Sequence, residues 1–233
     1  MLEFLHVTDP HLVFPGESLR GLDPFDRLRA CINDILEEHA DAQFCVITGD
    51  IADRGENDAY VAFAELMQSL QMPVHILVGN HDDRDAFRRV LPEVPVDADG
   101  FVQSGFDCDG GRFLLLDTLE SGDAAGSGYY CAARQAWLRR ELDDAGDRPV
   151  YLFMHHPPFD VGIPGLDCIG IINREEFASI LDGRTNVRHL FFGHAHRPIF
   201  GSWRGVPVST LFATAHQVAL DLRPAEGEPA RLR

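Results

Sequence analysis

Short apolar runs alternate with longer amphipathic segments along most of the chain. Six runs of four or five residues, rich in Val, Ile, Leu and Phe and ending in turn residues, are predicted to be buried strands: residues 4–8, 44–48, 74–78, 113–116, 150–154 and 189–192. Residues 25–38, 60–70 and 137–142 repeat apolar side chains at spacings of three and four, which is typical of helices that bury one face. This strand–helix–strand order favours parallel pairing in a layered α/β fold.

The C-terminal part of the chain has a different pattern. Residues 199–203, 206–211 and 217–222 are predicted to be strands joined by short turns, and we expect them to form an antiparallel meander that closes a second sheet. Residues 224–233 are rich in Pro, Glu and Gly and are expected to form a loose tail. No internal repeat and no clear linker occurs before them, so residues 1–223 are predicted to form one domain.

The composition narrows the range of functions. The 233 residues carry a formal net charge of -17, which disfavours binding to nucleic acids and to anionic membranes. All 20 basic residues are Arg, so Schiff-base lysine chemistry and a P-loop lysine are excluded. The five cysteines form no CxxC motif and are expected to be free thiols in a reducing compartment. The sequence shows no basic leader segment and no membrane-spanning apolar run, so we expect a cytoplasmic protein.

Polar side chains follow five of the predicted strands at the point where each strand ends. They are Asp9, His11, Asp50, Asn80, His155, His194 and His196. Ligands of open α/β sheets bind outside the carboxyl ends of the strands, so we expect these seven side chains to meet at one rim. Glycines precede Asp50, Asn80 and His194, where tight turns and a close approach of the backbone are expected.

These seven residues are of metal-ligand types. Imidazole nitrogens, carboxylates and an Asn carbonyl suit Mn, Fe and Zn. Two ions can share seven such side chains if one carboxylate bridges them, and two-metal sites hold their ions roughly 3.5–4 Å apart and activate a water between them. Two divalent ions, two carboxylates and one hydroxide leave a net charge of about +1, which would attract a singly charged phosphodiester. The sequence therefore predicts a two-metal hydrolase of phosphate esters.

The order and spacing of these residues resemble those of the calcineurin-like metallophosphoesterases. The matching motifs are Asp9-x-His11, Gly49-Asp50, Gly79-Asn80-His81-Asp82, His155 and Gly193-His194-x-His196, and they span residues 9–196. The bacterial class III cyclic-nucleotide and glycerophosphodiester phosphodiesterases look most similar. The resemblance implies an α/β fold of four layers, an αββα sandwich in which two central mixed β-sheets are flanked by helices. Residues 1–223 would be its catalytic domain.

The resemblance also implies a role for each residue. Asp9, His11 and His196 would hold one metal ion. Asn80, His155 and His194 would hold the other, and Asp50 would bridge the two. His81 would contact the substrate phosphate and protonate the leaving group, and Asn80 would also face the substrate. Residues 214–218 resemble the same phosphodiesterases, so His216 is expected to line the substrate pocket.

Some alternatives stay open at this point. His156 could be the ligand in place of its neighbour His155, whereas His6, His75 and His189 lie within apolar runs and are interpreted as core or edge histidines. The favoured function is hydrolysis of small phosphodiesters, either cyclic nucleotides or glycerophosphodiesters. The alternatives are a phosphomonoesterase or nucleotide pyrophosphatase on the same metal site, and a non-catalytic metal-binding scaffold. A homo-oligomer is expected because the proteins that the chain resembles are often dimeric or larger.

Overall fold

The computed structural model describes residues 2–121 and 126–223, so the predicted tail lies outside the described residues. Its strands are β1 (Leu5–Val7), β2 (Cys45–Thr48), β3 (Val74–Leu77), β4 (Ser104–Cys108), β5 (Gly111–Leu116), β6 (Val150–Met154), β7 (Val187–Phe192), β8 (Ile199–Trp203) and β9 (Val206–Thr210). Its helices are α1 (Pro24–Glu38), α2 (Asn57–Met67), α3 (Arg84–Val90), α4 (Ala132–Ala145), α5 (Pro164–Asp167) and α6 (Arg174–Leu181).

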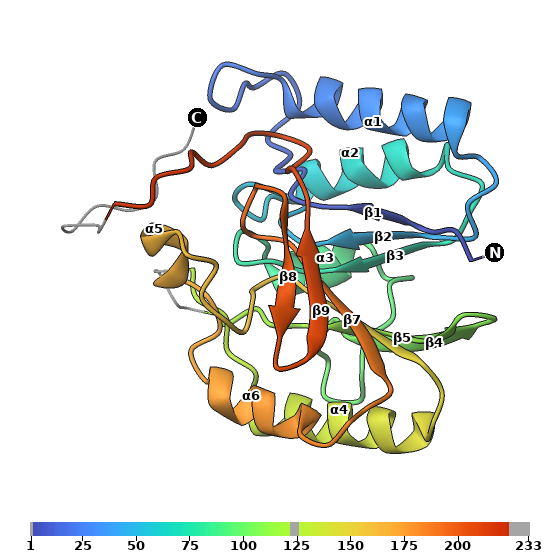
Figure 1. Ribbon diagram of the computed structural model, residues 1–233. Helices are drawn as coiled ribbons and strands as arrows, with labels where there is room; N and C mark the ends of the chain where they lie inside the picture. Colours follow the sequence, from blue (N-terminus) through green and yellow to red (C-terminus); the bar gives the residue numbers. More distant parts are fainter. Residues whose placement is uncertain (1, 122–125, 224–233) are drawn as a thin grey trace.

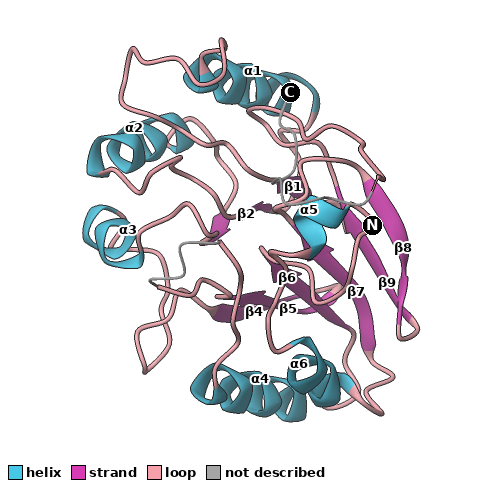
Figure 2. Ribbon diagram, turned by 90° about the vertical axis from the view of Figure 1, so that its left-hand side faces the viewer, coloured by secondary structure: helices cyan, strands magenta, loops and turns pink. Residues whose placement is uncertain are grey.

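The strands form two sheets that stack between two layers of helices. The first sheet has the order β1-β2-β3 and only parallel pairs, and the second has the mixed order β4-β5-β6-β7-β9-β8. Figure 1 shows α1 and α2 above the first sheet, and α4 and α6 below the second sheet. In the view of Figure 2 the helices α1, α2 and α3 form one outer layer. The predicted four-layer αββα sandwich is therefore confirmed.

Each pair of neighbouring layers buries its own apolar cluster. Side chains such as Leu28, Phe63 and Phe87 fill the space between the first helical layer and the first sheet. Leu138 and Phe177 belong to the cluster between the second sheet and its helices. A third cluster lies between the sheets and contains Phe44, Val46, Leu77, Phe113, Leu115 and Phe153. Strands covered on both faces must be apolar throughout, which is why they appear in the sequence as unbroken apolar runs.

Local sequence signals set where the helices begin. The Asp23 side chain accepts hydrogen bonds from the backbone N–H groups of Phe25 and Asp26, at 2.9 and 3.4 Å, and Pro24 occupies the first position of α1. The Asp83 side chain caps α3 in the same way, through the N–H of Ala86 at 2.7 Å. Asp83 comes soon after the Gly79-Asn80-His81-Asp82 motif, so this cap places the start of α3 directly behind the predicted site.

One predicted element is wrong, and others were missed. Apart from a single bridge residue at Val218, residues 217–222 form no strand. Side chains hold this segment instead: the Arg197 guanidinium donates to the Val218 carbonyl, and the Gln217 amide donates to the Ala213 carbonyl. β4, α3, α5 and α6 were not predicted from the sequence. Within the described ranges, every helix is too short or too polar to cross a membrane.

Candidate metal centre

All seven predicted ligand residues lie at the carboxyl ends of strands from both sheets. The first sheet contributes Asp9 and His11 after β1, Asp50 after β2 and Asn80 after β3, whereas the second contributes His155 after β6 and His194 and His196 after β7. Six of them are buried and Asn80 is partly buried. The ligand atoms of Asp9, His11, Asp50 and His196 all lie within 4.8 Å of one another. The structure therefore brings the predicted set together.

The loops that carry these residues have unusual backbone geometry. Seven described residues other than glycine have a positive φ, and five of them are Asp9, His11, Asp50, His194 and His196. Such conformations cost of order 1–3 kcal/mol each and cluster at functional sites. Position 79 must be glycine for a steric reason, because a Cβ there would lie 2.2 Å from Oδ1 of Asp50. The fold thus maintains a strained rim in order to point these side chains inward.

Asp50 lies between two groups of ligands. On one side, Nε2 of His196 is 3.3 Å from Oδ1 of Asp9 and 3.1 Å from Nε2 of His11. On the other side, Oδ1 of Asn80 is 3.1 Å from Nε2 of His155 and 2.9 Å from Nδ1 of His194. Oδ2 of Asp50 is 3.3 Å from Nε2 of His11 and also 3.3 Å from Nε2 of His155. One carboxylate oxygen is therefore within reach of both groups.

The outer nitrogens of three histidines are held by oxygen acceptors. Nδ1 of His11 contacts the Asp53 carboxylate at 3.2 Å. Nδ1 of His155 contacts the Thr48 carbonyl at 2.7 Å, and Nδ1 of His196 contacts the His216 carbonyl at 2.8 Å. Carbonyl and carboxylate oxygens only accept, so each of these contacts requires a proton on Nδ1 and leaves Nε2 facing inward. Once Nε2 carries no proton its lone pair can bind a cation, so this donor set fits bound metal ions.

The structure also distinguishes His155 from His156. Both nitrogens of His156 face protein groups: Nδ1 lies 2.7 Å from the Thr118 hydroxyl, and Nε2 lies 3.2 Å from the Gly126 carbonyl. Nε2 of His155 instead points at Asp50 and Asn80. This arrangement favours His155 as the ligand and gives His156 the role of holding the Gly126 loop beside Asn80.

The two buried aspartates are charged at neutral pH. Burial raises the pKa of both carboxyls, but neighbouring histidines, chiefly His196 for Asp9 and His155 for Asp50, outweigh it and hold both pKa values below their usual range. Burial lowers the pKa of His155, yet Asp50 outweighs it and raises that pKa to about 9. Burial and the charge of His155 lower the pKa of His194 to about 3. Metal ligands must be deprotonated, so a cation bound here would displace the second proton of His155.

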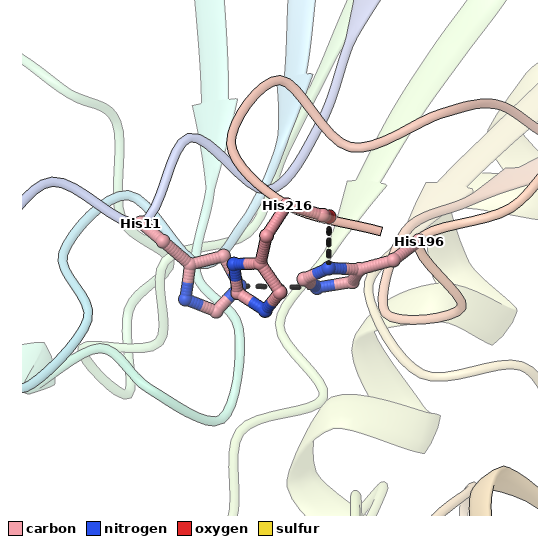
Figure 3. Close-up of side chains that lie close together, drawn as sticks. All are labelled: His11, His196 and His216. Carbon is pink, nitrogen blue, oxygen red and sulfur yellow. Dashed lines mark hydrogen bonds between the residues drawn. The ribbon is translucent and has the colours of Figure 1, made fainter. Parts of the chain in front are cut away.

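Two further predicted residues border the ligand cluster. The His81 side chain is 42% exposed, and its ring centroid lies 4.7 Å from that of His11. The buried His216 ring lies 5.0 Å from the His11 ring and 4.6 Å from the His196 ring, and Figure 3 shows the three rings gathered together. In the described part of the chain, Nδ1 of His216 has no hydrogen-bond partner. Both side chains therefore lie beside the predicted ligands, His81 on the exposed side and His216 in the buried part.

Two aspartates that the sequence interpretation did not assign support the site. Asp53 accepts from His11 through its carboxylate, and its carbonyl lies 2.7 Å from Nδ1 of His81. Asp82 is buried and accepts the N–H groups of Ile51, Ala52 and Gly79 at 2.9–3.2 Å. Asp82 thereby ties the loop after β2 to the loop after β3. Its place as the last residue of the Gly-Asn-His-Asp motif was the only available signal for this role.

Known proteins match the chain over most of its length. The sequence profile described as calcineurin-like phosphoesterase matches residues 2–198. A probable cyclic nucleotide phosphodiesterase of Rhodopseudomonas palustris is 42% identical over 227 residues, which cover 97% of this chain and 82% of that protein. A glycerophosphodiester phosphodiesterase of Enterobacter lignolyticus is 30% identical over 232 residues, covering 94% of this chain and 81% of that protein.

A solved structure agrees with the fold described above. A dimetal phosphatase of Danio rerio superposes with a TM-score of 0.72 at 20% identity, covering 92% of this chain and 88% of that chain. At this level of identity the superposition supports the architecture alone. The sequence matches carry the assignment: this chain belongs to the calcineurin-like phosphoesterase family and is a hydrolase of phosphate esters.

Proposed function

We propose that this enzyme binds two metal ions and hydrolyses small phosphodiesters. The observation that carries the proposal is the place of Asp50, whose Oδ2 is 3.3 Å from the ring nitrogens of both His11 and His155. A carboxylate oxygen between two groups of ligands suits a bridge between two ions. Asp9, His11 and His196 would hold one ion, and Asn80, His155 and His194 would hold the other. Manganese, iron and zinc all suit this set of nitrogen and oxygen donors.

The side chains around the ions would orient and complete the reaction. Two bound ions would polarise the phosphate and lower the pKa of a water between them. Asp53 fixes the orientation of the His11 ring, and through its carbonyl it also fixes the His81 ring. Asn80 and His81 lie on the same loop, so His81 can meet the phosphate and the leaving oxygen while Asn80 holds an ion. His216 would border the substrate on the side of His11 and His196.

Charge and the names of the relatives both support a diester substrate. Two divalent ions, the carboxylates of Asp9 and Asp50 and one hydroxide carry about +1, which matches a monoanionic diester better than a dianionic monoester. The two relatives named above are a probable cyclic nucleotide phosphodiesterase and a glycerophosphodiester phosphodiesterase. We therefore infer that cyclic nucleotides or glycerophosphodiesters are the substrate class.

The stoichiometry of bound metal tests the two-ion centre. We expect the purified protein, stripped with a chelator, loaded with manganese and desalted, to retain about two equivalents of manganese per chain, because two complete sets of donors are present. Elemental analysis gives the ratio, and activity is measured on the same sample. One tightly bound equivalent together with full activity would contradict the proposal.

Paired substrates test the preference for diesters. We expect the manganese-loaded enzyme to cleave bis(p-nitrophenyl) phosphate with a higher kcat/KM than p-nitrophenyl phosphate. The leaving group is the same in both substrates, so the comparison reports the charge and shape of the phosphate. Varying the ionic strength provides a control, because a preference that arises from charge weakens as salt screens the site. A higher kcat/KM for the monoester would favour the alternative function of phosphomonoesterase.

A further inference from the structure

A chain of hydrogen bonds links the partly buried His6 to Asp9. Nε2 of His6 lies 2.8 Å from the Thr48 hydroxyl. The Thr48 hydroxyl donates to the Thr8 hydroxyl at 2.7 Å, and the Thr8 hydroxyl donates to Oδ2 of Asp9 at 2.6 Å. His6, Thr48 and Thr8 do not belong to the predicted set of ligands.

The chemistry of the groups fixes the direction of this chain. Asp9 is a charged carboxylate and can only accept, so Thr8 must donate to it. The Thr8 oxygen then accepts from Thr48, and the Thr48 oxygen accepts from the N–H of His6. This requires a proton on Nε2 of His6. Burial lowers the pKa of His6 to about 4, which agrees with a neutral ring at physiological pH.

The chain lies in the apolar space between the two sheets. The His6 ring packs edge-on against Phe153 and Phe191 of the second sheet, with centroids 6.0 and 5.7 Å away. Thr8 and Thr48 are fully buried. Burying a polar group in such a place costs free energy unless the group is hydrogen-bonded, and apolar side chains would satisfy packing alone. The approach is also tight, because a Cβ at Gly193 would lie 2.5 Å from the Thr8 hydroxyl oxygen.

The chain leaves each oxygen of Asp9 in a distinct environment. Oδ2 is held by Thr8, whereas Oδ1 accepts the backbone N–H of His194 at 3.2 Å and faces Nε2 of His196 at 3.3 Å. Thr48 also reaches the other half of the site, because its carbonyl accepts from Nδ1 of His155 at 2.7 Å. Thr48 is thus linked to a proposed ligand of each ion. Its carbonyl contacts His155 directly, and its hydroxyl is connected to Asp9 through the Thr8 hydroxyl.

We propose that His6, Thr48 and Thr8 are positioning residues that hold Asp9 with Oδ1 turned toward a bound metal ion. This inference rests on the proposed two-metal function. Thr8 acts on Asp9 directly, and Thr48 and His6 act by orienting and polarising the hydroxyl before them. The effect of breaking the chain must therefore decrease with distance from Asp9, since Thr8 can still donate after either of the other two is lost.

Manganese affinity measured by calorimetric titration tests this order. Thr8→Val removes the hydroxyl at nearly constant volume. We expect it to weaken manganese binding at one of the two sites, the one that contains Asp9, by roughly 10–100-fold, the usual effect of losing an outer partner of a metal ligand. Thr8→Ser keeps the hydroxyl and should restore most of the affinity. Thr48→Val and His6→Leu should cause smaller losses, in that order. The electron paramagnetic resonance spectrum of bound manganese should change in Thr8→Val as well.

Thr210 provides a matched control elsewhere in the protein. It is fully buried in β9, and its hydroxyl has no partner among the described residues. Thr210→Val should leave manganese affinity and spectrum as in the wild type. Equal affinities for Thr8→Val and Thr210→Val would overturn the inference while leaving the two-metal proposal intact. Wild-type protein that binds no manganese would overturn both. If Thr8→Val does not fold, the test rests on Thr48→Val and His6→Leu. Manganese affinities equal to that of Thr210→Val in both variants would overturn the inference.

Discussion

Asp50→Ala is expected to abolish turnover while leaving the fold in place. Oδ2 of Asp50 is equidistant from the ring nitrogens of His11 and His155, and Oδ1 accepts the backbone N–H of His81 at 2.9 Å. Removing this carboxylate takes a ligand from both proposed ions and releases the loop that carries His81. The loss of activity should exceed the roughly 100-fold that follows from removing an outer partner of a ligand. Steady-state kinetics and metal analysis of the same sample measure the effect.

Two controls separate this loss from unfolding. Circular dichroism and the melting temperature of the metal-free protein show whether Asp50→Ala still folds. Asp147→Ala removes a carboxylate from the exposed turn before β6 and should retain full activity and both metal equivalents. If Asp50→Ala keeps two equivalents and turns over at the wild-type rate, Asp50 is not the bridge.

The apolar runs made the rim of the site predictable. A strand buried on both faces leaves an unbroken apolar signal, and the first polar residues after it mark the strand end. Asp50 follows β2 and His155 follows β6, and both strands end in the structure at the predicted residue, Thr48 and Met154. Parallel strands present their carboxyl ends on one side of the sheet. The predicted strand ends were therefore enough to place the seven predicted ligands at one rim.

Features that depend on contacts between distant residues could not be predicted in this way. The contacts of His156 that favour His155 as the proposed ligand are made with the Thr118 hydroxyl and the Gly126 carbonyl, which lie 38 and 30 positions earlier in the chain. Residues 217–222 have the composition of a strand, but within the described residues only Val218 forms a bridge, and hydrogen bonds from Arg197 and from the Gln217 side chain hold the segment. The expected cytoplasmic location and homo-oligomer stay predictions.

The expectation for His6 is met only in part. Its position within an apolar run predicted a core or edge histidine with a satisfied ring; Nε2 is hydrogen-bonded to Thr48, but Nδ1 has no partner among the described residues. Only the register of β1 against β2, which places His6 opposite Val46, brings the His6 side chain to the same face of the sheet as that of Thr48. A periodic pattern reports which face is buried, but it cannot report which partner a buried polar group meets there.

His81→Ala is expected to lower turnover by roughly 10²–10⁴-fold with slow leaving groups, the usual contribution of a general acid. The Asp53 carbonyl holds Nδ1 of His81, which leaves Nε2 for the substrate, and the half-exposed ring lies beside His11 on the rim of the site. A p-nitrophenolate leaves with little help from a proton, whereas a glycerol or ribose oxygen needs protonation. The loss in kcat should therefore be larger for a glycerophosphodiester or a cyclic nucleotide than for bis(p-nitrophenyl) phosphate.

Metal content and a second histidine variant make this comparison decisive. His81 is not among the seven proposed ligands, so His81→Ala should keep about two equivalents of manganese. His39→Ala removes a partly exposed histidine at the end of α1 and should leave both rates unchanged. Equal losses with good and poor leaving groups would show that His81 positions the phosphate and donates no proton. Wild-type rates in His81→Ala, or the loss of one equivalent of metal, would remove His81 from the catalytic residues altogether, because each result would mean that the ring acts at a place other than the leaving oxygen.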